Sequence, residues 1–179
     1  DAEARSILVD DLFTRMDRPH DRLRPLVREG DAPAIEVIER ALRDKRSYIR
    51  KAGLSQFLRR TNPKLCGPNG RAVLIEHEPA MQSAQEIQAF VYALLNTDPE
   101  RAVRYVATNW EKFPRDGVRM TCLRVLGEAY GKAARSAAID LALSKAAPKA
   151  PMQMLTSIAT VLSGPAGSDG TGGYGWSLR

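Results

Sequence analysis

The feature of this sequence that most constrains its fold is an apolar stripe that recurs at helical spacing. In the first clear example the apolar side chains are Ala34, Ile35, Ile38, Ala41 and Leu42. This is the i, i+3, i+4, i+7 pattern that places side chains on one face of an α-helix. Pro33 suits the first turn of such a helix, because the N–H that proline lacks would have no partner there. The stretch therefore predicts an amphipathic helix.

The same stripe returns along the rest of the chain. It covers residues 87–95, 102–110, 118–129, 134–141 and 154–162. Asp98-Pro99 precedes the second of these as an N-cap followed by proline at the first helical position. Residues 72–75 are compatible with a helix or a strand, and we expect a helix because no second strand is available to pair with them. With aromatic residues at only 6% of the composition, the sequence predicts an all-α protein.

The connections between these stretches are short, which favours antiparallel packing of neighbouring helices. The exceptions are residues 61–70, which read as a true loop, and residues 164–179, which are too rich in glycine for a stable element. A chain of 179 residues suffices for one domain with a sizeable core. We expect one helical domain over residues 1–163 and a glycine-rich tail over residues 164–179.

Residues 33–61 also carry a local pattern beyond the stripe. Asp44 is followed by Ile49-Arg50, then by Ala52-Gly53 and Phe57-Leu58. This resembles the HEAT repeat, a helical hairpin in which an aspartate lies in the turn after the first helix and a Val-Arg pair begins the second. The resemblance implies that Arg50 is a structural residue that pairs with Asp44 or with an acid of a neighbouring repeat.

A second, weaker match covers residues 113–130. Val118-Arg119 is followed by Cys122, Val125 and Leu126, about two HEAT-sized units after Ile49-Arg50. The pattern departs from the family in three places: Phe113 stands where an aspartate is usual, Ala84-Gln85 replaces Val-Arg in the middle unit, and the first helix lacks its usual proline.

The resemblance implies a short α-solenoid of antiparallel helical hairpins, and an irregular helical bundle is the alternative. A single hairpin cannot bury its apolar face alone, so hairpins stack on one another. HEAT surfaces hold other macromolecules, chiefly proteins and sometimes nucleic acid. We therefore expect a non-enzymatic protein-interaction or scaffold module with a protein partner, and keep a nucleic-acid-binding protein as the alternative.

The alternative depends on a set of cations that we call the basic cluster. Its members are Arg40, Arg43, Lys45, Arg46, Arg50, Lys51, Arg59, Arg60 and Lys64. The net charge of +6 is modest for a dedicated nucleic-acid binder. On a helical wheel, moreover, these cations do not form one stripe, which favours structural or solvated roles over phosphate binding. Within the cluster, the candidates for partner contacts are Arg43, Arg46 and Arg59.

No constellation in the sequence predicts a catalytic, metal or cofactor site. The only histidines, His20 and His77, lack the HExxH spacing and are expected at solvated positions. Cys122 occupies a small-residue position of a helical stripe, where burial is the expected role, and it and Cys66 are expected to be separate free thiols. The glycine-rich tail has neither the Lys-Ser/Thr ending nor the flanking strand of a phosphate loop.

Two aromatic residues in the tail, Tyr174 and Trp176, are the remaining candidates for partner binding. They are expected either to dock on this domain or a partner, since aromatics supply large contact areas at low entropic cost, or to remain disordered. No apolar run is long enough to predict a membrane-spanning helix. The chain begins at Asp1, which is compatible with a secreted or periplasmic protein after signal cleavage and equally with a cytoplasmic one.

Overall fold

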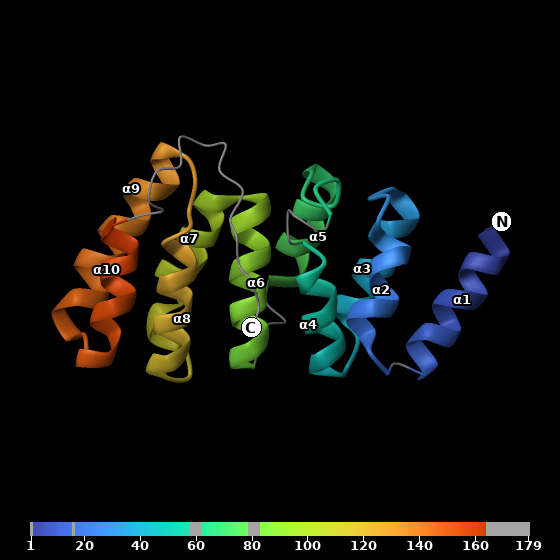
Figure 1. Ribbon diagram of the computed structural model, residues 1–179, viewed down its shortest axis with the longest axis horizontal. Coiled ribbons are helices and arrows are strands. Elements are labelled where there is room, and N and C mark those ends of the chain that lie inside the picture. Colours follow the sequence, from blue (N-terminus) through green and yellow to red (C-terminus); the bar gives the residue numbers. More distant parts are fainter. Residues whose placement is uncertain (1, 16, 58–61, 79–82, 164–179) are drawn as a thin grey trace. The chain divides into compact units, whose positions relative to one another are not determined.

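The computed structural model describes residues 2–15, 17–57, 62–78 and 83–163 (Figure 1). Within them every regular element is helical and no strand is present, as the sequence predicts. The chain divides into two compact units, Asp1–Asp98 (unit 1) and Pro99–Arg179 (unit 2), and each is treated separately below. The expectation of a single domain over residues 1–163 stays a prediction.

Unit 1 contains six helices in its described residues. They are α1 (Ala2–Arg15), α2 (Pro19–Val27), α3 (Ala32–Arg43), α4 (Ser47–Ser55), α5 (Pro68–His77) and α6 (Ala84–Thr97). Helices α3 and α4 form one hairpin, and α5 and α6 form the next. Because α3 also packs on α5 and α4 on α6, the two hairpins make two layers, α3 with α5 and α4 with α6 (Figure 1).

The boundaries of α3 and α6 follow from side chains that the sequence places there. Asp31 Oδ1 accepts a hydrogen bond from the Ala34 N–H at 2.9 Å and so begins α3. Ser83 and Glu86 form a reciprocal capping box at the start of α6, with Ser83 N–H donating to Glu86 Oε2 at 2.9 Å. These caps satisfy backbone N–H groups that a helix leaves without partners in its first turn.

The core of unit 1 lies between the two layers and under α2. Its large, fully buried side chains are Leu23, Ile38, Leu42, Ile49, Leu54, Phe57, Leu65, Leu74, Phe90 and Leu94. Burying one such side chain contributes about 1.5 to 3 kcal/mol relative to leaving it in water. Since these residues come from both hairpins and from α2, each hairpin buries its apolar face against its neighbours.

The loop predicted over residues 61–70 is shorter than expected. Helix α5 begins at Pro68, with Gly67 as its N-cap, so the last part of the predicted loop is helical. Gly70 is buried where α5 passes the preceding chain: a Cβ atom there would lie 1.8 Å from the Leu65 carbonyl oxygen and 2.9 Å from Phe57 Cε1. A glycine-rich segment here thus reflects a close approach of backbone to backbone and not a long turn. The expected helix over residues 72–75 is confirmed.

Unit 2 is also entirely helical in its described residues. Its elements are α7 (Pro99–Asn109), the 3-10 turn η2 (Trp110–Lys112), α8 (Asp116–Leu126), α9 (Lys132–Leu141), the π-helical segment η3 (Ala142–Ala146), the 3-10 turns η4 (Ala147–Lys149) and η5 (Met152–Met154), and α10 (Leu155–Ser163). Helix α7 packs on α8 and α9, and α10 packs on α8 and α9. Residues 146–151, whose two prolines suggest a connection between helices, are therefore mostly helical.

Phe113, which departs from the HEAT pattern, has a structural explanation. It is buried in the turn between α7 and α8, and its ring lies 6.3 Å from that of Tyr105. An apolar contact thus holds this turn where the family pattern has an aspartate. Helices α1 and α2 are not among the helices that the apolar periodicity predicts. Within the described residues, each helix is too short or too polar to cross a bilayer.

Candidate interaction surface

The basic cluster lies in unit 1, and most of its described members pair with carboxylates of that unit. Arg40 Nη1 lies 2.5 Å from Asp10 Oδ1, and Lys64 Nζ lies 3.1 Å from Glu29 Oε2. Exposed ion pairs of this kind contribute little to stability, but each places a negative charge beside a cation. The electrostatic potential around the cluster is therefore weaker than its composition suggests.

Arg43, a predicted partner-binding residue, also has carboxylate neighbours. Its Nη2 lies 2.8 Å from Glu76 Oε1 on α5, and its Nη1 lies 3.9 Å from Glu39 Oε2 one turn earlier on α3. The side chain is 58% exposed, so it remains accessible to a partner. Arg59, predicted for the same role, lies outside the described residues.

Arg46, the third candidate from the cluster, is held in the turn between α3 and α4. Its Nε and Nη2 donate to the two carboxylate oxygens of Asp44 at 2.8 and 2.7 Å, and Nη2 also donates to the Phe13 carbonyl at 2.8 Å. The hydrogen bonds from Arg46 lower the pKa of Asp44 and outweigh its partial burial, while Asp44 raises the pKa of Arg46. This bidentate pair fixes the turn.

Arg50 forms the most buried ion pair of the cluster. Its Nε donates to Glu86 Oε1 on α6, and its Nη1 donates to the Asp44 carbonyl at 2.6 Å. Side-chain exposure is 15% for Arg50 and 1% for Glu86. Burial raises the pKa of Glu86, but the hydrogen bonds from Arg50 and Ser83 outweigh it and leave that pKa lowered.

This contact bears on both partners expected for Arg50. The acid of a neighbouring hairpin is present as Glu86, whereas Asp44 contributes its backbone carbonyl and its carboxylate binds Arg46 instead. The sequence analysis did not single out Glu86. The spacing of Ser83 and Glu86 is that of a capping box and was visible in the sequence. No local pattern, however, connects Glu86 with Arg50, which lies far away along the chain.

Few described cations of the cluster lack a carboxylate partner. Of the members that the structure describes, Lys45 and Lys51 are the ones with no carboxylate within ion-pair distance. Lys45 lies in the turn before α4, and Lys51 lies on the exposed side of α4. Two lysines neutralise too few phosphates for strong binding of a duplex, because affinity grows with each phosphate contacted.

The outer side of the α4 and α6 layer has a distinct composition, and we call it the α4–α6 face. Its exposed and half-buried residues follow one stripe on each helix: Ser47, Tyr48, Lys51 and Ser55 on α4, and Gln85, Gln88, Ala89, Tyr92 and Asn96 on α6. The two helices contain a single carboxylate, Glu86, and it is buried. The face therefore presents amides, hydroxyls and two tyrosines with one positive charge.

His20 lies at the edge of this face. Its Nδ1 is 2.7 Å from Ser55 Oγ, so the start of α2 is tied to the end of α4. Burial and the nearby Lys51 lower the pKa of His20, and the nearby Asp21 opposes them. The imidazole is exposed, as predicted, but its position is fixed by this hydrogen bond.

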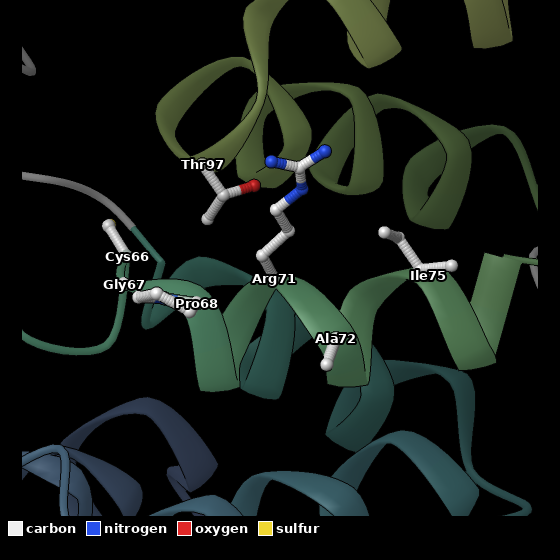
Figure 2. Close-up of a pocket in the computed structure, with 7 residues that line it drawn as sticks. All are labelled: Cys66, Gly67, Pro68, Arg71, Ala72, Ile75 and Thr97. Atoms are coloured by element: carbon white, nitrogen blue, oxygen red, sulfur yellow. The ribbon is translucent and has the colours of Figure 1, made fainter.

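A pocket of about 350 Å³ lies in unit 1 at the start of α5. It is lined by Cys66, Gly67, Pro68, Arg71, Ala72, Ile75 and Thr97, and Figure 2 shows Arg71 extending from α5 toward Thr97. The guanidinium already binds Asp98, with Nη2 to Oδ2 at 2.6 Å, and the Cys66 thiol lies 3.1 Å from the Phe57 carbonyl. The pocket thus has no nucleophile next to a base.

The second histidine, His77, and the two cysteines complete the set of groups that the sequence analysis considered for chemistry. His77, expected at a solvated site, is instead buried on α5, and its Nε2 has no hydrogen-bond partner. Burial lowers its pKa, against the nearby Glu76. Cys66 and Cys122 are free thiols; Cys122 is buried, as predicted, and burial raises its pKa to about 12. A thiol of that pKa stays protonated at neutral pH and is a poor nucleophile.

Arg119, at the second HEAT arginine position, lies in unit 2 and has a different set of partners. Its Nε donates to the Trp110 carbonyl at 2.9 Å and its Nη1 to Asp116 Oδ1 at 2.7 Å. The guanidinium carbon also lies 5.9 Å from the centre of the Trp110 ring. All these partners belong to the hairpin of α7 and α8, so Arg119 closes the turn of its own hairpin.

Helix α10 exposes an apolar stripe that we call the α10 face. Met152, just before the helix, is 80% exposed, Leu155 is 47% and Leu162 is 42%, and Ala159 between them is also exposed. Both leucines fall within the apolar stripe that the sequence shows over residues 154–162, but the structure leaves them exposed. The buried side is formed by Met154, Ile158 and Val161. The sequence signal was present, because this helix is apolar on more than one side.

The last two candidates, Tyr174 and Trp176, lie outside the described residues. Among the described residues, no three histidine, cysteine, aspartate or glutamate side chains come together as a group that could hold a metal ion. No protein-family model matches the chain, and no characterised protein sequence matches it significantly.

Proposed function

We propose that this protein is a non-enzymatic interaction module in which HEAT-like helical hairpins stack as a short α-solenoid and bind a protein partner through the α4–α6 face. The observation that carries the proposal is the composition of that face. Two neighbouring helices of one layer expose amides, hydroxyls and tyrosines, and their single carboxylate is buried in an ion pair with Arg50.

Such a surface suits a protein partner on physical grounds. Tyrosine is enriched at the centre of protein interfaces because it offers a large apolar ring and a hydrogen-bonding group at low entropic cost. Tyr48 is 48% exposed on α4, and the half-buried Tyr92 lies on α6. Side-chain amides such as those of Gln85 and Gln88 can donate and accept hydrogen bonds with a partner's backbone.

The alternative, nucleic-acid binding, has less support. Arg40, Arg43, Arg46, Arg50 and Lys64 each have a carboxylate partner within unit 1. The α4–α6 face retains Lys51 as its available cation, and one or two phosphate contacts give weak binding that salt abolishes.

The test compares affinity capture from the native host by the full chain and by matched variants. We expect a specific protein to be retained by the unaltered chain and lost with Tyr48→Ala and Gln88→Ala. It should be kept by Glu36→Ala, which alters an exposed residue of α3. Capture that is unaffected by the Tyr48 and Gln88 substitutions would contradict the proposed surface.

A parallel titration with fluorescent duplex DNA and single-stranded RNA tests the alternative. We expect weak binding at low salt that disappears near physiological ionic strength, because few phosphates are neutralised. Tight binding that persists at that ionic strength and weakens in the variant Lys45→Gln/Lys51→Gln would favour the nucleic-acid function instead.

A further inference from the structure

We propose that the α10 face is covered by this chain's own residues 174–178, through Tyr174, Trp176 and Leu178. The inference concerns unit 2 and is independent of the function proposed for the α4–α6 face. It starts from the four residues of the α10 face, Met152, Leu155, Ala159 and Leu162, which no other described residue covers.

The α10 face is a continuous apolar stripe. Leu155, Ala159 and Leu162 follow the i, i+4, i+7 spacing, and Met152 extends the stripe by one turn at the start of the helix. No charged residue occurs between Ala150 and Ser163, so no charge beside the stripe opposes an apolar partner. Contiguous exposed apolar surface of this kind usually marks a contact site.

The sequence that follows the helix supplies a matching set of side chains. Between Gly164 and Arg179 the bulky apolar residues are Tyr174, Trp176 and Leu178, and most of the others are glycine, serine, alanine or threonine. At alternate positions, three side chains of an extended segment point to the same side. Their span of about 13 Å is close to the roughly 11 Å between Leu155 and Leu162 along the helix.

The connection is long enough for this contact. Ten residues separate Ser163 from Tyr174, and an extended chain of that length reaches about 35 Å. Helix α10, with nine residues, is only about 14 Å long. The segment can therefore reach every position on the α10 face, and glycines within it allow the reversal of direction that the contact needs.

Covalent attachment favours this occupant over a second copy of the chain or a separate protein. A segment joined by a short flexible linker has an effective concentration in the millimolar range near its attachment point. A contact with a dissociation constant between the micromolar and the millimolar range does not hold a free partner at micromolar concentration, but it is largely formed when the partner is tethered. The segment also carries few charges, Asp169 and Arg179, so it brings little charge to an uncharged helix.

The experiment measures acrylamide quenching of Trp176 in the full chain with the substitution Trp110→Phe, which leaves Trp176 as the single tryptophan. We expect quenching severalfold weaker than in a free peptide of residues 164–179. Leu155→Asp and Leu162→Asp should each restore quenching to the level of the peptide. The control Ile7→Asp alters a residue that is 62% exposed on α1 of unit 1 and should change nothing.

Other occupants of the α10 face give different results. Protection of Trp176 that rises with protein concentration, together with dimers in sedimentation, would mean that a second copy covers the face and would overturn the proposal. Quenching equal to that of the free peptide at every concentration would overturn it as well. Because Trp110 is buried and Trp110→Phe can disturb unit 2, the ¹⁹F spectrum of 5-fluorotryptophan-labelled chain, assigned with Trp176→Phe, gives the same comparison with Trp110 intact.

Discussion

Arg50 in unit 1 and Arg119 in unit 2 occupy the same position in a local sequence pattern but stabilise different contacts. Arg50 reaches a buried carboxylate of the next hairpin, Glu86, and so joins two hairpins. Arg119 binds Trp110 and Asp116, which belong to its own hairpin. The comparison shows that a repeat pattern predicts where an arginine lies, while the position of an acid distant in sequence decides what it stabilises.

The cores of the two units differ in a related way. Unit 1 buries large side chains such as Phe57 and Phe90, and it also contains the buried Arg50 and Glu86 pair. Unit 2 relies more on small side chains at its helix contacts, among them Ala102, Ala138 and Ala142. We therefore expect unit 1 to be more sensitive than unit 2 to the loss of a single central contact.

The largest effect should come from replacing the two arginines. Arg50→Ala leaves Glu86 buried without its cation and should lower the free energy of unfolding by about 3 kcal/mol. Arg119→Ala removes hydrogen bonds to the Trp110 carbonyl and to the exposed Asp116, leaves no buried charge unpaired, and should cost about 1 kcal/mol. Chemical denaturation gives the totals, and hydrogen exchange shows which helices lose protection. Equal losses in the free energy of unfolding for the two variants would contradict the distinction between an arginine that joins two hairpins and one that stabilises its own.

Two glycines sharpen the same comparison. Gly70→Ala forces a Cβ to within 1.8 Å of the Leu65 carbonyl oxygen, and we expect a loss of about 2 kcal/mol from overpacking. Gly117→Ala on α8 meets no atom within 4 Å and should stabilise unit 2 by about 0.5 kcal/mol through its better helix propensity. Both values come from thermal or denaturant unfolding of the full chain, and a neutral Gly70→Ala would refute the close approach at α5.

A smaller effect should follow from pH, and in unit 1 alone, since both histidines lie there. Burial holds the pKa of His77 below its ordinary value of 6.5, so the folded state favours the neutral ring. The stability this gives is present above pH 6.5 and is lost as the pH falls below it, because the unfolded chain then binds the proton more readily.

The measurement is the denaturation midpoint at pH 7.5 and at pH 5.5. His77→Leu should reduce the loss seen between the two values, and amide protection should fall in α5 but not in α8. A second variant, His20→Gln, is measured in the same way, because burial and Lys51 also lower the pKa of His20. It separates the part of the pH-dependent loss that comes from His20 from the part that comes from His77. A loss of stability that persists unchanged in the His77 variant would assign it to another group.

The helices could be predicted from the sequence more fully than the contacts between them. Periodicity located the helices that became α3, α6, α7, α8, α9 and α10, because a strong amphipathic pattern is a local property. It missed α1, whose apolar residues Ile7 and Leu8 remain exposed in the structure. It could not show that Leu155 and Leu162 are exposed, since periodicity identifies apolar faces but cannot say which of two faces a neighbour covers.

The candidate site was less predictable for a related reason. The basic cluster was visible as a set of cations, but its carboxylate partners Asp10, Glu76 and Glu86 come from other helices, and Glu29 comes from the turn after α2. Which charges meet depends on tertiary packing, and a single sequence contains no direct signal of it. The α4–α6 face became visible only when the burial of Glu86 was known.

The smallest effect is expected at the exposed pairs of the cluster. Arg43→Ala removes ion pairs with Glu76 and Glu39, but its side chain is 58% exposed, so we expect a loss below about 0.5 kcal/mol. Raising the salt concentration should reduce even that difference, because exposed pairs are screened. A loss comparable to that of Arg50→Ala would contradict the contrast between buried and exposed members of the cluster.

The central claim is that Arg50 is a structural link between hairpins, and a double-mutant cycle with Glu86 tests it most directly. The cycle uses Arg50→Met, Glu86→Gln and the double variant, with free energies of unfolding measured by chemical denaturation of the full chain. We predict a coupling energy of about 2 kcal/mol, with the double variant much more stable than the sum of the single losses implies. Losses that add to within about 0.5 kcal/mol would contradict the claim.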